Sequence, residues 1–269
     1  MVPVNFTSSC WMIYSLPRQL PKGQKLYFAS DFHLGAPNHA SSRQRERLII
    51  NWLDSIAPDA HTIFLMGDIF DFWFEYKHVI PKGFIRIQGK LAQLIDSGIN
   101  IVFFTGNHDM WMFDYFSTEL GIPIYRDPVP MTINGKTFLL GHGDGLGPGD
   151  AIYKILKKIF ANPVCQWLFG FLHPWIGMGI AQTWSGRSRL HNDKKTGLLE
   201  TESEWLFTYC KEVEAKQHHD FYIFGHRHLP LDLAVNKNSR YINLGEWIQE
   251  RTYAVFDGEN LELKKYVEA

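Results

Sequence analysis

The chain has 269 residues, 45% of them hydrophobic, which is enough for one large α/β domain with a sizeable core and requires no second independent domain. A formal net charge of −1 creates no overall field that would recruit nucleic acid, so we expect no nucleic-acid partner. The three cysteines, Cys10, Cys165 and Cys210, have no paired spacing, and no apolar stretch approaches the roughly 18 residues of a spanning helix, so we expect neither a disulfide framework nor a transmembrane segment.

An N-terminal arm, residues 1–24, precedes the first predicted element. It lacks the basic and apolar regions of a signal peptide, and with the unpaired cysteines this indicates a cytosolic protein. Met12 stands where translation could also begin, so the sequence leaves open whether the part of the arm before Met12 belongs to the native protein.

Strand-like and helix-like segments alternate along the first half of the chain. Short apolar runs predict strands, and apolar residues at helical spacing predict helices. In chain order the predicted elements are a strand over Lys25–Ser30, a helix over Ser41–Ala57, a strand over His61–Met66, a helix over Gly83–Ser97, a strand over Asn100–Thr105 and a short helix over Trp111–Leu120. Pro58 and Gly98 end the two longer helices.

The second half begins with a predicted hairpin and returns to strands near its end. The hairpin joins Met131–Ile133 to Thr137–Leu140 through Asn134-Gly135, a favoured two-residue turn. The later predicted strands are Phe221–Phe224, Leu231–Val235, Arg240–Leu244, Thr252–Phe256 and Leu261–Tyr266. This succession of elements predicts the α/β class.

Residues 150–217 form a mainly helical insertion, much longer than a crossover helix requires. Its first part carries apolar residues at helical spacing beside Lys154, Lys157 and Lys158, and a cluster rich in Trp and Phe follows. In one interpretation this is a lid whose aromatic residues fill a small core of its own. We favour a second, in which a cap over the active site binds acyl chains and rests on a lipid headgroup layer, with the lysines facing anionic headgroups.

Five short polar motifs carry most of the chemical information, and each follows a strand-like segment. They are Asp31-Phe32-His33, Gly67-Asp68-Ile69-Phe70-Asp71, Gly106-Asn107-His108-Asp109, Gly141-His142-Gly143-Asp144 and Gly225-His226-Arg227-His228. Side chains beyond the carboxyl ends of neighbouring strands meet at one edge of a sheet, and the glycines allow close approach there. Asp, Asn and His are the ligands for two divalent cations that share a bridging carboxylate. The motifs therefore predict a dinuclear metal site and a hydrolase of phosphate esters or anhydrides.

Through these motifs the chain resembles the calcineurin-like metallophosphoesterase superfamily from about Lys25 to its end. The resemblance implies a four-layer α/β/β/α sandwich over residues 25–269, with residues 150–217 inserted as a helical cap. It implies two divalent metal ions, most readily Mn²⁺, with Zn²⁺ and Fe²⁺ also compatible with the ligand types. The implied ligands are Asp31, His33 and His228 for the first metal, Asn107, His142 and His226 for the second, and Asp68 as the bridge.

The same resemblance implies a catalytic role for His108, with Asp109 orienting it by accepting its ring N–H. Asp71 and Asp144 are open to two interpretations of equal weight. Each either supports the site from behind the ligands or caps a loop as a turn former. 

The insertion narrows the resemblance to the UDP-2,3-diacylglucosamine hydrolase branch of the superfamily. The segments that carry this likeness are Asp150-Ala151-Ile152-Tyr153, Asn162-Pro163, Gln166-Trp167-Leu168-Phe169, Ile180-Ala181, Ser188, Phe70-Asp71-Phe72-Trp73 and Leu244-Gly245-Glu246-Trp247. The likeness implies hydrolysis of the pyrophosphate of an acylated UDP-sugar in lipid A synthesis, by a cytoplasmic enzyme peripheral to the inner membrane. The residues expected to contact the substrate are Asp150, Tyr153, Trp167, Phe171, Trp175, Arg187, Ser188, Lys194 and Lys195. One departure is His108, because this branch commonly has Arg after the metal-binding Asn.

Two other functions remain open at this level. A soluble metallophosphoesterase acting on nucleotides or other phosphodiesters would have the same metal motifs but would not need an apolar cap. A non-catalytic metal-binding scaffold would be expected to have lost ligands, and no motif here lacks one. The sequence leaves open the metal, the acyl chains and the oligomeric state, for which we expect a monomer.

Overall fold

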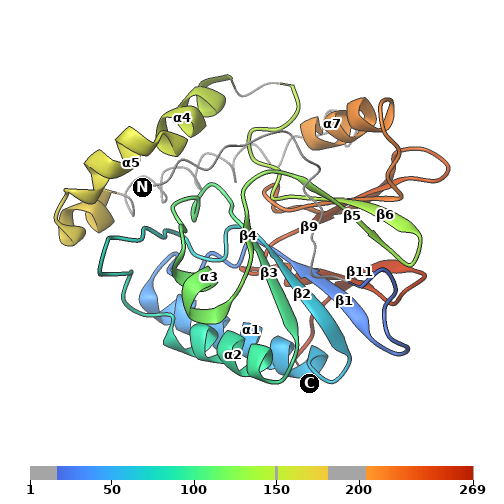
Figure 1. Ribbon diagram of the computed structural model, residues 1–269, viewed down its shortest axis with the longest axis horizontal. Coiled ribbons are helices and arrows are strands. Elements are labelled where there is room, and N and C mark those ends of the chain that lie inside the picture. Colours follow the sequence, from blue (N-terminus) through green and yellow to red (C-terminus); the bar gives the residue numbers. More distant parts are fainter. Residues whose placement is uncertain (1–16, 149–150, 181–203, 269) are drawn as a thin grey trace.

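The computed structural model describes residues 17–148, 151–180 and 204–268. Two β-sheets lie face to face with helices on their outer faces, and the helices of residues 151–180 lie beyond the edge of this body (Figure 1). Of the predicted arm, the described part is bound to the fold: Asn134 donates its backbone N–H to the carbonyl oxygen of Arg18 at 2.9 Å, and Leu20 donates to the Asn134 side chain at 2.8 Å. The division of the chain into arm and domain stays a prediction.

The first sheet has six strands in the order β11-β10-β1-β2-β3-β4. Their bounds are β1 Lys25–Ala29, β2 Ala60–Met66, β3 Asn100–Phe104, β4 Ile124–Tyr125, β10 Thr252–Phe256 and β11 Leu261–Lys265. Strands β1 to β4 are parallel, and β10 pairs antiparallel with β1, so the C-terminal hairpin extends one side of the sheet. The long apolar run in β2 fits its place inside a covered parallel sheet.

The second sheet has five strands in the order β5-β6-β7-β9-β8. Their bounds are β5 Val129–Ile133, β6 Lys136–Leu140, β7 Phe221–Phe224, β8 Pro230–Ala234 and β9 Arg240–Leu244. The predicted hairpin is confirmed: β5 and β6 pair up to the turn residues Asn134 and Gly135, whose φ angles of 50° and 75° are those that such a turn requires. Strands β6, β7 and β9 run parallel, as β1 to β3 do in the other sheet.

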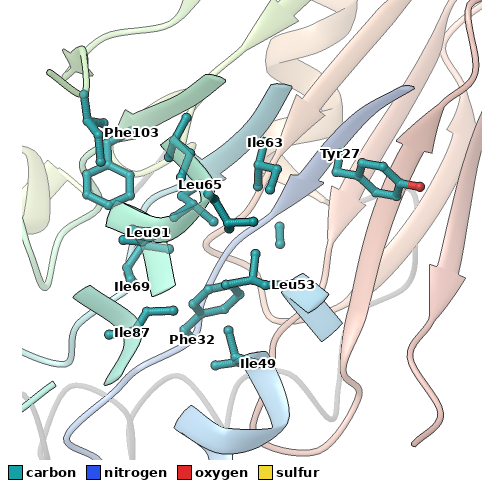
Figure 2. Packing of buried hydrophobic residues seen from close by; sticks show 14 of the residues in the cluster. Tyr27, Phe32, Ile49, Leu53, Ile63, Leu65, Ile69, Ile87, Leu91 and Phe103 are labelled. Atoms are coloured by element: carbon teal, nitrogen blue, oxygen red, sulfur yellow. The ribbon is translucent and has the colours of Figure 1, made fainter. Parts of the chain in front are cut away.

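Three helices cover the outer face of the first sheet. They are α1 His39–Ile56, α2 Ile85–Asp96 and α3 Tyr115–Leu120. In α1 the Asn38 side chain accepts the N–H of Ser41 at the start, and apolar residues at helical spacing face inward. Figure 2 shows Ile49 and Leu53 of α1 directed toward side chains of the sheet such as Ile63.

Helix α3 begins four residues later than its predicted start at Trp111. The Glu75 carboxylate, which comes from a distant loop, accepts the backbone N–H groups of residues 113–115 at 2.7–3.1 Å. These groups are the unpaired donors of a helix N-terminus, so a tertiary contact decides where the helix begins.

The second sheet is covered by α7, Trp205–Glu214, whose Leu206, Phe207 and Cys210 are buried against it. Between the sheets lies a separate apolar layer that includes Phe28, Phe64 and Phe138. The layers therefore follow the order α/β/β/α, and the predicted four-layer sandwich is confirmed.

The cap consists of α4, Ala151–Ala161, and α5, Pro163–Gly170, followed by helical residues 174–180. These helices lie beyond the edge of the sheets (Figure 1). Helix α7 lies within the predicted insertion, residues 150–217, but belongs to the sandwich, and the described part of the cap covers residues 151–180. Within the described ranges, no helix combines the length and hydropathy needed to span a bilayer.

Candidate metal centre

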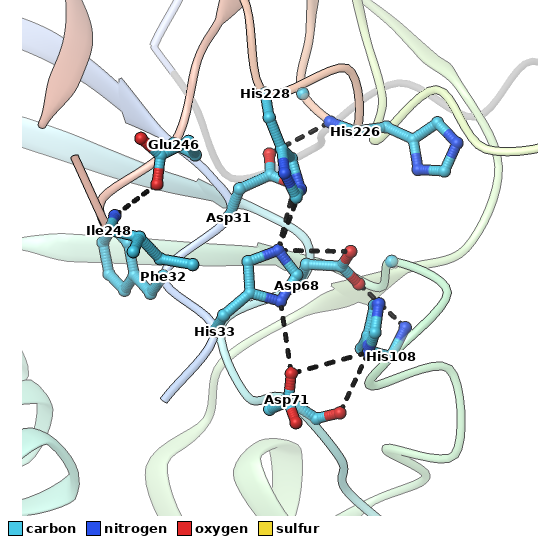
Figure 3. Close-up of polar contacts among 12 residues, drawn as sticks. Asp31, Phe32, His33, Asp68, Asp71, His108, His226, His228, Glu246 and Ile248 are labelled. Carbon is cyan, nitrogen blue, oxygen red and sulfur yellow. Dashed lines mark hydrogen bonds and ion pairs between the residues drawn. The ribbon is translucent and has the colours of Figure 1, made fainter. Parts of the chain in front are cut away.

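The five motifs follow the ends of β1, β2, β3, β6 and β7 and converge in space. Figure 3 shows members of four of them, among them Asp31, Asp68, His108 and His228. Three overlapping groups of side chains place one potential ligand atom from each member within 4.8 Å of the others. The groups are Asp31 with His33 and His228, Asp68 with His142 and His226, and His33 with Asp68 and His108. The first two correspond to the predicted environments of the two metals.

Asp68 lies between the two groups. Its Oδ2 is 3.4 Å from His142 Nε2 and 4.0 Å from His33 Nε2, so one carboxylate faces a ring from each group. In the first group His228 Nε2 is 3.2 Å from Asp31 Oδ1 and 3.0 Å from His33 Nε2. This geometry is compatible with Asp68 as the bridge between two cations.

Several of these buried atoms have no hydrogen-bond partner among the described residues. They include Asn107 Oδ1, and also Asp31 Oδ1 and His142 Nε2, which have ion-pair neighbours in His228 and Asp68 but no hydrogen bond. Buried polar atoms normally have partners, because an uncompensated one is costly. The three are the atom types that bind divalent cations, so the donor set fits a dinuclear metal centre.

The backbone of the centre is held in an unusual conformation. Five of the predicted ligands, all non-glycine, have φ between 45° and 68°: Asp31, His33, Asp68, His226 and His228. This region is sparsely populated by residues with side chains, and it is maintained here by bonds between the loops. Asp31 donates its N–H to Gly67 at 3.0 Å, and His33 donates to Asp68 at 2.9 Å.

Two motif glycines are required by close approach rather than by their φ angles. A Cβ on Gly225 would lie 2.5 Å from Asp31 Oδ2, and a Cβ on Gly106 would overlap the Asp68 carboxylate. A methyl group at either position would displace a predicted ligand. The glycine pattern seen in the sequence thus has a direct geometric cause.

The electrostatics of the centre favour cations. Burial alone would lower the pKa of His142, but the surrounding carboxylates, led by Asp68, raise it to about 10. Burial raises the pKa of Asp68, and the stronger influence of His142 and His108 brings it well below its usual range. His226 differs, since burial and then the charge of His142 lower its pKa to about 3 and keep its imidazole neutral for coordination.

The predicted partner of His108 is wrong. Its Nδ1 donates to the backbone carbonyl oxygen of Asp71 at 3.0 Å and lies 3.8 Å from the Asp71 carboxylate (Figure 3). Asp71, rather than Asp109, therefore fixes the ring. Of the two roles considered for Asp71, this favours support of the site over the capping of a loop. A carbonyl oxygen can only accept, so Nδ1 carries the proton and Nε2 is the ring nitrogen that can accept one.

Asp109 instead holds the loops together. Its carboxylate accepts the backbone N–H groups of Gly106 at 2.7 Å, Ile69 at 2.8 Å and Asp68 at 3.3 Å. Burial, followed by the charge of Asp68, raises the pKa of Asp109 to about 7. A carboxylate surrounded by backbone donors is not available to a neighbouring ring, which is the physical reason for the correction.

Asp144 connects the centre to the cap. Tyr153 of α4 donates its hydroxyl to Asp144 Oδ2 at 2.7 Å, and Lys157 Nζ lies 2.7 Å from the same oxygen. Lys154 donates to the carbonyl oxygen of Gly147. The prediction that Lys154 and Lys157 face headgroups is therefore wrong, because both amines are bound to the loop that follows β6; Lys158 is exposed.

The cap uses its aromatic residues on two sides. Phe169 packs against Phe74 and Trp111, and Trp111 Nε1 donates to the Phe160 carbonyl oxygen at 2.8 Å, so the inner side is attached to the body. On the outer side Trp167 is 62% exposed, Phe171 69% and Trp175 80%. These three do not fill a core within the described structure, and their contact with a substrate stays a prediction.

Five other residues predicted to contact the substrate, Asp150, Arg187, Ser188, Lys194 and Lys195, lie outside the described residues.

Sequence reasoning missed two supporting residues. Arg45 is buried in α1 and donates to the carbonyl oxygens of Phe32 at 2.7 Å and His33 at 2.6 Å, which fixes the loop of the first motif. Arg227, inside the fifth motif, pairs with the buried Glu204 at 2.9 Å. No local pattern signals either contact, because the partners are brought together by the fold.

The chain is similar in sequence to known proteins over most of its length. The family model described as calcineurin-like phosphoesterase matches residues 24–230. A UDP-2,3-diacylglucosamine hydrolase of Porphyromonas gingivalis is 40% identical, with 89% of this chain and 97% of the relative covered. The enzyme of the same name from Vibrio atlanticus is 28% identical, with 89% and 96% covered. Among solved structures, a dimetal phosphatase from Danio rerio gives a TM-score of 0.44 at 12% identity, over 91% of this chain and 96% of that one. The similarity to the curated relatives extends well beyond the metal-site motifs.

Proposed function

The chain belongs to the calcineurin-like phosphoesterase family of metal-dependent hydrolases, and from this premise we propose that it hydrolyses the pyrophosphate bond of UDP-2,3-diacylglucosamine. The products would be UMP and 2,3-diacylglucosamine 1-phosphate, as in lipid A synthesis. The observation that carries the proposal is the direct attachment of an apolar cap to the loop of a metal centre. A phosphohydrolase of small soluble nucleotides has no use for that combination.

The chain's own residues divide the work. We propose Asp31, His33 and His228 around one cation and Asn107, His142 and His226 around the other, with Asp68 between them. Cations bound there would polarise the phosphoryl group and lower the pKa of the attacking water. His108, held by Asp71, would exchange a proton or hydrogen bond with the leaving oxygen through Nε2.

Manganese is the metal that we propose. Carboxylate, amide and imidazole ligands suit Mn²⁺, and the described part of the centre contains no thiolate, which softer metals prefer. Zn²⁺ and Fe²⁺ share these ligands, so reconstitution of metal-free protein with each ion distinguishes them. The highest turnover with Mn²⁺ supports the proposal, and inactivity with Mn²⁺ beside full activity with another ion rejects it.

The outer face of the cap supports peripheral association with the cytoplasmic face of the inner membrane. Nine of the twelve exposed large apolar side chains of the described residues lie within the cap, including Trp167, Phe171 and Trp175. Aromatic side chains insert readily at the headgroup boundary. Because Lys154 and Lys157 face inward, we expect binding to depend on apolar contact more than on charge.

Vesicle binding tests this expectation. The protein should float with zwitterionic phosphatidylcholine vesicles, and raising the salt concentration from low to high should change the bound fraction little. Binding that requires anionic lipid and disappears at high salt would contradict the apolar mode.

A substrate panel tests the proposed reaction. Turnover is measured in detergent with Mn²⁺ on UDP-2,3-diacylglucosamine, UDP-glucosamine, a bis-aryl phosphate and a cyclic nucleotide. We expect release of UMP and a strong preference for the diacylated compound, because each buried methylene contributes about 0.8 kcal/mol. Equal turnover of UDP-glucosamine or the cyclic nucleotide would favour the alternative, a soluble metallophosphoesterase acting on nucleotides or other phosphodiesters.

A further inference from the structure

One side of α4 is attached to the loop that follows β6. Tyr153 donates its hydroxyl to Asp144 Oδ2 at 2.7 Å. One helical turn later, Lys157 Nζ lies 2.7 Å from that oxygen and donates to the Asp144 carbonyl oxygen at 2.9 Å. Residues four apart share one face of a helix, so Tyr153 and Lys157 both bind Asp144. Lys154 donates a further hydrogen bond to Gly147.

The loop that follows β6, which Tyr153 and Lys157 bind at Asp144, also contains His142, a predicted ligand of the second metal. His142 precedes Asp144 by two residues, with only Gly143 at φ 116° between them. His142 Nδ1 donates to the Met66 carbonyl oxygen at 2.9 Å, which directs Nε2 toward Asp68. The Tyr153 ring lies 6.3 Å from the ring of His226, the other histidine of that group. The attachment of α4 through Tyr153 and Lys157 thus adjoins the ligand group of Asp68, His142 and His226.

The ion pair between Asp144 and Lys157 is costly to break. Asp144 is 4% exposed, so its charge depends on protein partners rather than on water. Removing one member of a buried ion pair leaves the other uncompensated, which is more costly than never having formed the pair. Loss of the Lys157 amine would therefore force Asp144, and the short loop behind it, to move.

We propose that Lys157 and Tyr153 are positioning residues that lock the cap to the second metal position through Asp144. The cap helix and the loop of His142 then move as one unit, and displacement of the cap weakens the metal bound by Asn107, His142 and His226. Asp31, His33 and His228 lie on other loops and keep their metal. The inference rests on the proposed metal centre, but it does not depend on the identity of the substrate.

Metal binding by Lys157→Met tests this proposal, because methionine keeps much of the apolar stem and removes the amine. Mn²⁺ titration by calorimetry should show one site unchanged and the other weakened by roughly tenfold to a hundredfold, the range for residues that support metal ligands. Metal content after desalting should fall from two ions per chain toward one. Lys157→Arg should restore most of the loss.

The matched control is Lys158→Met, which removes the same charge from an exposed position of the same helix and should leave both sites unchanged. If Lys157→Met fails to fold, Tyr153→Phe removes a single hydroxyl and should weaken the same site by a smaller factor. Two sites of unchanged affinity in Lys157→Met, or equal weakening of both, would overturn the proposal. A wild-type protein that binds two Mn²⁺ but ignores the acylated substrate would contradict the proposed reaction alone.

Discussion

The sandwich and the cap contain the same kinds of aromatic side chain and use them in opposite ways. Trp52, Trp247 and Phe32 are fully buried and pack edge to face or tilted against one another. Trp167 and Trp175 of the cap are mostly exposed. A buried ring stabilises the fold by leaving water, whereas an exposed ring contributes nothing until a partner covers it. The comparison teaches that the aromatic side chains of the sandwich stabilise the fold, whereas those of the cap are left exposed, where we propose that they bind a partner.

The largest expected effect concerns the chemistry that the sandwich supports. Asp68→Ala should lower kcat by at least about 10⁴-fold, which corresponds to roughly 5.5 kcal/mol, and should release at least one metal ion. Asp68 is the carboxylate that faces both ligand groups, so its loss leaves two cations facing each other. Steady-state kinetics and metal analysis measure this. Two metals at full occupancy with substantial turnover would show that Asp68 is not the bridge.

The next effect compares one tryptophan from each region. Trp52→Ala should reduce the free energy of unfolding by about 3–5 kcal/mol, because it empties a packed site in α1. Trp175→Ala, at an 80% exposed position, should change it by no more than about 0.5 kcal/mol. Urea or thermal unfolding gives both values. Similar losses in the two variants would mean that the cap aromatics belong to a core after all.

Substitution of His108 tests whether this residue assists the leaving group or binds a metal. His108→Ala should keep both metals and lose roughly 10²–10³ in kcat, the usual scale for one acid or one oxyanion donor. Its ring is held by the Asp71 carbonyl oxygen, which any substitution of the Asp71 side chain retains, so Asp71→Asn should lose less. Release of a metal from His108→Ala would place this ring among the ligands instead.

The smallest expected effect concerns the exposed aromatic side chains of the cap. Replacing Phe171 and Trp175 by Ala should raise KM for the diacylated substrate at least about tenfold, or about 1.4 kcal/mol, because the acyl chains lose apolar contact. Hydrolysis of a small water-soluble aryl phosphodiester should hardly change, since the metal centre is untouched. Equal losses on both substrates would remove the acyl-binding role from these residues.

The sequence by itself determined the parts of this protein that depend on short-range patterns. Periodicity and turn chemistry predicted the strands that lead to the site, and the Asn134-Gly135 hairpin formed as expected. The order of the five motifs predicted the ligand types and their convergence at one sheet edge, because parallel strands end together.

Only the tertiary structure decided which partner each polar group met. Asp109 accepts backbone N–H groups from two loops, whereas the ring of His108 is bound by Asp71, although Asp109 follows His108 directly in the sequence and Asp71 is 37 residues away. Lys157, on the polar side of an amphipathic helix, turned to Asp144 instead of to solvent. The partner of a polar group depends on which donors and acceptors the fold brings within hydrogen-bonding distance and on which buried groups most need a partner. The spacing of residues along the sequence specifies neither.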